Sequence, residues 1–98
     1  QGIMMLREVL AKDPKNELAL FSLGMLSVQS GQNDKAVERL NELVAINPDN
    51  IQAQLLLGVA LMNLGEKVKA REQFEKVKKM DQDPAVQSAA DSYLDDLK

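Results

Sequence analysis

Residues 47–67, NPDNIQAQLLLGVALMNLGEK, repeat the pattern of residues 13–33, DPKNELALFSLGMLSVQSGQN, and this repetition decides the fold. Both segments begin with an Asx-Pro pair that is followed two residues later by Asn. Both continue into an apolar run with Leu-Gly at its centre and a second Gly near its end. A recurring unit of this kind is the first feature to test, because repeat architectures are built from one supersecondary unit.

The two segments are offset by 34 residues, and the same offset relates positions beyond them. Seven pairs of similar residues keep this register: Pro14/Pro48, Leu23/Leu57, Gly24/Gly58, Gly31/Gly65, Ala36/Ala70, Leu40/Phe74 and Leu43/Val77. Agreement at so many positions indicates a repeated structural unit rather than a chance similarity.

Each unit is predicted to contain two helices. In the first unit, an apolar face at helical spacing ends at Gly31, where a left-handed glycine can terminate a helix. Asp34 is predicted to be the N-cap of a second helix that continues to about Ile46. Asn47-Pro48 ends that helix, because proline disfavours helical geometry in the residue before it. A second pair of helices is predicted near residues 51–64 and 67–80.

Gly24 and Gly58 lie inside the first predicted helix of each unit. Glycine in a helix interior costs roughly 1 kcal/mol relative to alanine. We expect close packing of the paired helix to offset this cost, with the small Ala36 and Ala70 facing the glycines.

A 34-residue helix–turn–helix unit with Leu-Gly, a turn Gly, a following Ala and a closing Asx-Pro resembles the tetratricopeptide repeat. The resemblance implies an all-α fold, a right-handed α-solenoid of antiparallel helix pairs with about six helices. It assigns one full repeat to residues 17–50 and another to 51–84. It also assigns residues 1–16 to the second helix of a preceding repeat and residues 85–98 to a C-terminal capping helix.

Residues 1–16 keep the spacing of a second helix, since Gly2, Leu6 and Val9 precede Pro14 as their counterparts precede Pro48. The chain is therefore expected to start in mid-repeat and to be a fragment of a longer protein. At the other end, Asp83 is predicted as an N-cap with Pro84 in the first turn. The helix that follows carries an apolar stripe, formed by Val86, Ala89, Ala90, Tyr93, Leu94 and Leu97.

The resemblance also implies a concave groove, lined by the first helices of successive repeats, that receives a peptide or a helix. The matching positions are Leu18, Phe21, Ser22, Met25, Val28, Gln29, Gln52, Leu55, Leu56, Val59, Met62 and Asn63. None is basic, which argues against the carboxylate clamp found in one branch of the family. The groove is expected to bind an apolar helix or an extended peptide, with adaptable Met side chains. Two alternatives remain: some of these residues pack inside the array, or the C-terminal helix covers part of the groove.

A different class of function is structural. Ile3, Met4, Met5 and Leu6 are consecutive apolar residues that would form an exposed patch, and such patches mark association. The chain could thus be a spacer or a self-association element that forms a homodimer and has no separate ligand.

Composition excludes several other classes. Cysteine and histidine are absent, so thiol chemistry, disulfides and the usual ligands of a metal site are missing. The close carboxylates, Asp95-Asp96 and the Asp81/Asp83 pair, do not make an acid–base site, and no cofactor or enzymatic activity is expected. The net charge of −3 argues against nucleic acid, and no apolar run is long enough to span a bilayer. The sequence favours neither a cytoplasmic nor an exported (periplasmic) location.

Overall fold

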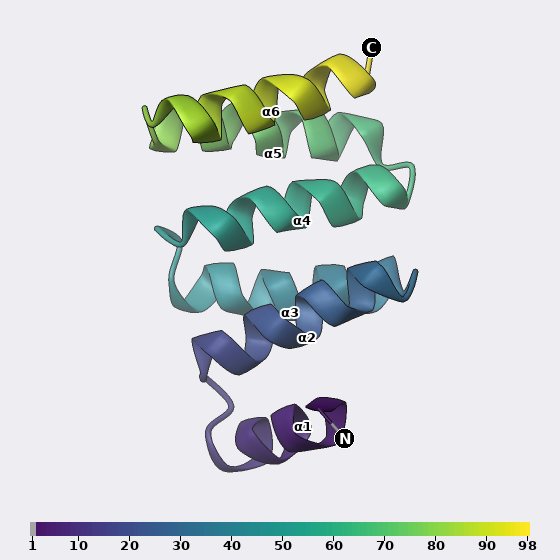
Figure 1. The fold of residues 1–98 in the computed structure, drawn as a ribbon, viewed down its shortest axis with the longest axis vertical. Helices are drawn as coiled ribbons and strands as arrows, with labels where there is room; N and C mark the ends of the chain where they lie inside the picture. Colours follow the sequence, from purple (N-terminus) through teal and green to yellow (C-terminus); the bar gives the residue numbers. More distant parts are fainter. Residues whose placement is uncertain (1) are drawn as a thin grey trace.

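The structure is a computed structural model that describes residues 2–98, with side chains from Met4 onward. Six helices make up this part of the chain, and it contains no strand (Figure 1). Their bounds are α1 (Gly2–Lys12), α2 (Glu17–Gln29), α3 (Asn33–Ile46), α4 (Ile51–Asn63), α5 (Lys67–Met80) and α6 (Pro84–Asp96). The predicted pairs of helices are therefore present, and their bounds agree with the prediction to within one or two residues.

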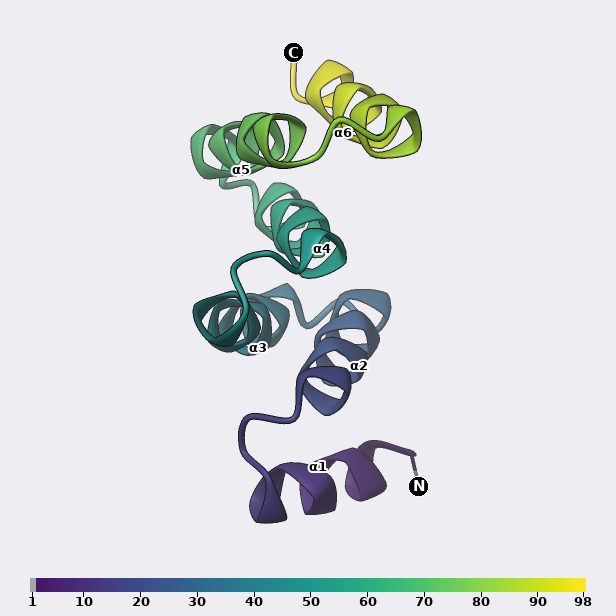
Figure 2. The same cartoon turned by 90° about the vertical axis from the view of Figure 1, so that its left-hand side faces the viewer.

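The helices stack along one axis of an elongated molecule with extents of 39 × 25 × 19 Å. Figure 2 shows two layers, with α3 and α5 on one side and α2, α4 and α6 on the other. The predicted all-α solenoid is confirmed. The division of the chain into units 1–16, 17–50, 51–84 and 85–98 stays a prediction.

Matching residues start and end the paired helices. The side-chain oxygens of Asn16 and Asn50 accept hydrogen bonds from the N–H groups of Ala19 (2.9 Å) and Ala53 (3.1 Å), which caps α2 and α4. Gly31 and Gly65 follow these helices with φ of 80° and 81°, the left-handed conformation that a Cβ would penalise. Sequence reasoning predicted the role of both glycines correctly.

The prediction for the start of α3 is wrong, whereas that for α6 is confirmed. Gln32 is the N-cap of α3 and makes no side-chain capping bond, so Asp34 lies in the first turn. There the carboxylate of Asp34 is close to the positive end of the helix dipole. For α6, Asp83 caps by accepting a hydrogen bond from the N–H of Ala85 at 2.8 Å, with Pro84 as the first helical residue.

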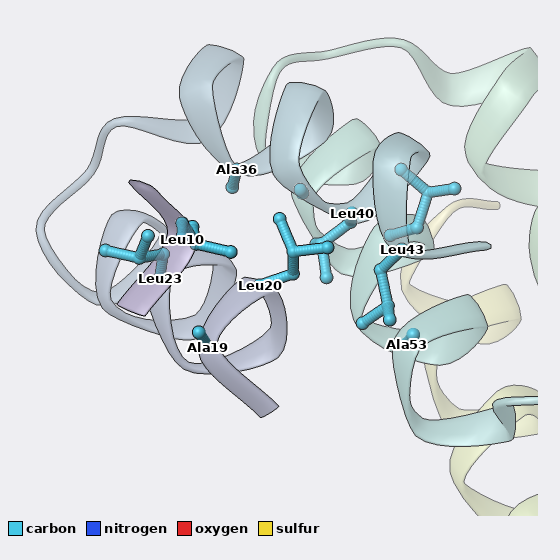
Figure 3. Close-up of a cluster of buried hydrophobic side chains, with 10 residues drawn as sticks. Leu10, Ala19, Leu20, Leu23, Ala36, Leu40, Leu43 and Ala53 are labelled. Carbon is cyan, nitrogen blue, oxygen red and sulfur yellow. The ribbon is translucent and has the colours of Figure 1, made fainter. Parts of the chain in front are cut away.

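Buried apolar side chains form two clusters. The first joins α1, α2, α3 and α4, and Figure 3 shows Leu20, Leu40 and Leu43 meeting between these helices. The second joins α5 and α6 through Ala70, Phe74, Ala90 and Leu97. No single cluster spans the molecule, as expected for a solenoid in which each unit packs on its neighbours.

The helix interiors pack closely at the two glycines, but against a different neighbour from the one predicted. A Cβ built on Gly24 would lie 2.9 Å from Cγ and Cδ2 of Leu40, and one on Gly58 would lie 2.6 Å from Cε1 of Phe74. Glycine is therefore needed because the large side chain one turn beyond Ala36 or Ala70 occupies the space. The two alanines are buried and leave room for the helices to approach.

Candidate functional site: an apolar hollow on α2, α4 and α6

An apolar hollow of about 330 Å³ lies on the layer formed by α2, α4 and α6. We call this feature the apolar hollow. Its lining residues are Phe21, Met25, Gln52, Leu55, Leu56, Val59 and Tyr93. None of these side chains is charged. The surface can therefore bury apolar groups without separating any charge from water.

Helical spacing brings these residues to one surface. Phe21 and Met25 are four residues apart, so they share a face of α2, and the lining residues of α4 recur at intervals of three and four. Phe21 and Leu56 also pack against the first buried cluster. Leu55 and Val59 pack against the second. The floor of the apolar hollow is thus continuous with the core of the molecule.

Tyr93 supplies a wall of the apolar hollow from α6. Its ring stacks on the fully buried Phe74, with ring centroids 5.0 Å apart and an interplanar angle of 13°. Sequence analysis placed Tyr93 in the apolar stripe of the last helix and did not include it in the groove. The sequence left open the alternative that the C-terminal helix covers part of the groove, but an apolar stripe alone does not show which side chain reaches the neighbouring helix.

Six of the twelve predicted groove residues line the apolar hollow, and six do not. Leu18 is 75% exposed at the start of α2. Val28 and Met62 pack against the first and second buried clusters. The side-chain amide of Asn63 donates to Oδ1 of Asn33 at 3.2 Å, and Ser22 and Gln29 lie outside the lining.

The predicted self-association patch is split by the structure. Met4 and Met5 are 66% and 67% exposed on α1. Leu6 turns inward and packs against the first buried cluster. The side chain of Ile3 lies outside the described residues.

Comparison with known families identifies the fold. A family model described as Tetratricopeptide repeat matches residues 1–50 and 27–91. The chain belongs to the tetratricopeptide repeat (TPR) family. TPR arrays are solenoids whose extended concave surfaces serve protein–protein interaction.

Solved TPR structures superpose on nearly all of the chain. The first TPR of Spaghetti (RPAP3), bound to the HSP90 peptide SRMEEVD, matches 97% of this chain over 73% of its own, with a TM-score of 0.88 and 19% identity. The second TPR domain of human RPAP3, in complex with the HSP70 peptide SGPTIEEVD, matches 97% of this chain over 77% of its own, with a TM-score of 0.87 and 19% identity. At this identity the likeness shows the fold.

A more similar sequence is that of MamA. A MamA D159K mutant is 31% identical, with a TM-score of 0.76, over 90% of this chain and 49% of that protein. The chain therefore spans about half of this relative. A search of curated proteins found no match.

Among the helices of residues 2–98, none has both the length and the apolar character needed to cross a bilayer. The described side chains also include no group of three or more potential metal-ligating residues close enough to share an ion.

Proposed function

We propose that this chain is a protein-interaction module that holds apolar side chains of a partner helix or peptide in the apolar hollow between α2, α4 and α6. The observation that carries the proposal is the uncharged lining of that hollow. Its volume of about 330 Å³ accommodates a few apolar side chains, not a folded domain. This is the arrangement in which an amphipathic helix or a hydrophobic peptide inserts its anchor residues into a groove.

The edges of the apolar hollow are suited to a variable partner. Met25, which is 37% exposed, can adjust its rotamers to different apolar surfaces. Gln52 and the hydroxyl of Tyr93 offer hydrogen bonds at the boundary, where they would orient a bound backbone. The core-packed floor limits the entropy lost on binding, because Leu55, Leu56 and Val59 are already partly immobilised.

The chemistry of this hollow differs from what an acidic tail requires. Three of the last four residues of the peptide SRMEEVD in the RPAP3 structure are acidic. Binding such a tail strongly requires charge-assisted hydrogen bonds from Arg or Lys. The apolar hollow contains neither, so we propose an apolar anchor in place of an acidic one.

Titration of the methyl resonances of the chain tests this function. The probe is a peptide of about 14 residues with Leu at i, i+3, i+4 and i+7 on a Glu/Lys background, which presents one apolar helical face. We expect saturable shifts at Leu55, Leu56 and Val59, and no comparable shifts with SRMEEVD. Met25→Lys should weaken binding at least tenfold, since the ammonium would lose water on complex formation.

Val68→Lys is the matched control, because Val68 is 65% exposed on α5 and lies outside the apolar hollow. It adds the same charge and should leave the affinity unchanged. Equal shifts at Leu55, Leu56 and Val59 with the acidic and the apolar peptide would overturn the proposal, as would equal affinity of Met25→Lys and the unmodified chain for the apolar peptide.

Self-association through α1 is the second candidate, and the exposure of Met4 and Met5 favours it. Light scattering over a roughly tenfold range of concentration distinguishes the two, because mass action makes a dimer depend on concentration. A dimer that Met4→Lys dissociates and Met25→Lys does not would assign α1 as the interface. A monomer throughout that range would reject this candidate.

A further inference from the structure

A second hollow, of about 410 Å³, lies among α1, α2 and α3. Most of its lining side chains are polar or charged, in contrast to those of the apolar hollow. Three cationic side chains line it, Arg7, Lys35 and Arg39, against one carboxylate, that of Glu38. Ser27, Ser30 and Gln32 add neutral polar groups. We call this set the cationic hollow. Its local excess of positive charge contrasts with the net charge of −3 of the whole chain.

The cationic hollow lies on a different face of α2 from the apolar hollow. At 100° per residue, Leu23, Leu26, Ser27 and Ser30 centre on a direction roughly 170° from that of Phe21 and Met25. One helix therefore contributes to both hollows from nearly opposite sides. A ligand in one hollow would leave the other open.

The cations of this hollow are poorly neutralised within the chain. The nearest carboxylate oxygen to Arg39 belongs to Glu42, at 3.7 Å, and both side chains are substantially exposed. Such surface pairs contribute little to stability. Among the described side chains, Arg7 and Lys35 take part in no ion pair. Three cations thus face the cationic hollow with their hydrogen-bonding capacity directed mostly at water.

The corresponding positions of the next helix pair show that the hollow is not required by the fold. At the offset of 34 residues, Ser27 and Ser30 become Leu61 and Leu64. Leu61 is half-buried and packs against both buried clusters. Arg39 becomes Gln73, whose amide donates to the backbone oxygen of Gln54 at 2.9 Å. The first pair therefore keeps two serines and a weakly paired, exposed cation, where the second pair has the core-packed Leu61, the 45% exposed Leu64 and the internally hydrogen-bonded Gln73.

The start of α3 adds to the positive potential. Gln32, which lines the cationic hollow, is the N-cap and makes no side-chain capping bond. The first N–H groups of the helix point away from its body, and the helix dipole places partial positive charge there. Asp34 lies in the same turn but is not among the lining residues.

We propose that the cationic hollow is an oxyanion-binding site for an acidic side chain of a partner protein segment, a glutamate or a phosphoserine. Arg guanidinium groups bind carboxylate and phosphate oxygens with paired hydrogen bonds, and Lys supplies a compact charge beside them. The hollow admits a side chain and its adjacent backbone. The net negative charge of the chain disfavours a polyanion such as nucleic acid, whose repulsion extends well beyond three cations.

Three blocked pentapeptides with the central residue phosphoserine, glutamate or serine, each flanked by glycines, are the probes. They are added to the ¹⁵N-labelled 98-residue chain at low ionic strength, where screening is weak. We expect saturable amide shifts at Ser27, Ser30, Gln32 and Lys35 with the phosphoserine peptide. Shifts with the phosphoserine peptide alone would show that the site is specific for phosphate. Shifts with both the phosphoserine and the glutamate peptide would show that it binds carboxylate as well as phosphate.

Two double variants separate charge from shape. Arg7→Gln with Arg39→Gln should weaken phosphoserine binding at least tenfold. Ser27→Leu with Ser30→Leu copies the second helix pair, retains every charge and should abolish binding by filling the hollow. Circular dichroism shows whether each variant keeps its helices, and the two designs do not share a substituted residue.

Equal shifts with the serine peptide would overturn the proposal, as would an unchanged affinity in Arg7→Gln with Arg39→Gln. Retained binding in Ser27→Leu with Ser30→Leu would overturn it too, since the anion would then sit on the general surface charge. Shifts confined to Leu55, Leu56 and Val59 would place the peptide in the apolar hollow and reject the cationic one. The two proposals can therefore fail independently.

Discussion

The helix pair α2–α3 and the helix pair α4–α5 place different side chains at equivalent positions of one scaffold. Gly24 faces Leu40 in the first pair, and Gly58 faces the ring of Phe74 in the second. The glycine is common to both because the backbone of one helix approaches a large side chain of the other. What fills the remaining space differs, and that difference sets the local packing.

The contrast is sharpest where Leu20 corresponds to Gln54. Both side chains are almost fully buried, yet one is apolar and the other is an amide. Gln54 donates to the carbonyl oxygen of Pro48 at 2.9 Å and accepts from the amide of Gln73. A buried polar group is tolerated when its hydrogen-bond partners are present. A buried position of the repeat can therefore change from apolar to polar if a second position supplies a hydrogen-bond partner, as Gln73 does for Gln54. The two helix pairs thus share small residues at equivalent positions, whereas the large buried side chains that pack around them differ between the pairs.

Of the substitutions that test the difference between the two helix pairs, Phe74→Ala should lower the free energy of unfolding most. Phe74 is fully buried and also carries the stacked ring of Tyr93, so its truncation should lower the free energy of unfolding by about 3–5 kcal/mol. Leu40→Ala, at the equivalent position, should cost about 2–3 kcal/mol, because no second ring depends on it. Urea unfolding followed by circular dichroism measures both. An equal or greater loss for Leu40→Ala would show that the stack contributes nothing.

A smaller effect is expected for Gly58→Ala. Its Cβ would lie within 3.0 Å of three ring atoms of Phe74, and a buried aromatic ring has little freedom to move. Overpacking of this kind costs about 1–3 kcal/mol, which exceeds the roughly 1 kcal/mol that alanine gains in helix propensity.

Gly24→Ala is the matched variant, and we expect a smaller loss because its Cβ would lie 2.9 Å from the nearest atoms of Leu40, whereas that of Gly58→Ala would lie 2.6 Å from the ring of Phe74. Combining Gly58→Ala with Phe74→Leu, which copies the first pair, should recover part of the loss beyond the sum of the single changes. Strict additivity in this double-mutant cycle would contradict a steric origin.

The smallest difference is expected at the caps. Asn16→Ala and Asn50→Ala each remove one side-chain bond to a backbone N–H, so each should cost about 1 kcal/mol. The two hydrogen bonds are of similar length, so the values should agree within about 0.5 kcal/mol. A clear inequality in thermal unfolding would mean that the two pairs differ in cap environment as well as in core.

Local features of this fold could be predicted because they depend on few residues. Asx-Pro pairs, turn glycines and apolar faces each act over one helical turn, and the bounds of α2, α4 and α5 and the end of α3 followed from them. The role of Asp83 as a cap was also predicted correctly, since Pro84 fixes where the helix begins. The start of α3 was missed, because the backbone of the tight turn at Gly31 places Gln32, not Asp34, at the helix boundary.

Features that depend on two helices were harder to predict. The family resemblance assigned Leu55, Leu56 and Val59 to the groove, but it did not indicate that Tyr93 would reach them from α6. Likewise, the pattern singled out Gly24 and Ala36 as close neighbours, although the side chain that meets the glycine is that of Leu40. The cationic hollow was not predicted at all, since Arg7, Lys35 and Arg39 come from two helices and form no motif along the chain.

The stack of Tyr93 on Phe74 has a practical consequence. Tyr93 is the only tyrosine in the chain, and there is no tryptophan. Its ring contacts the second helix pair on one side and borders the apolar hollow on the other. The intrinsic fluorescence of the unmodified protein is therefore a single-residue optical reporter, whose intensity responds both to detachment of α6 and to a ligand entering the hollow.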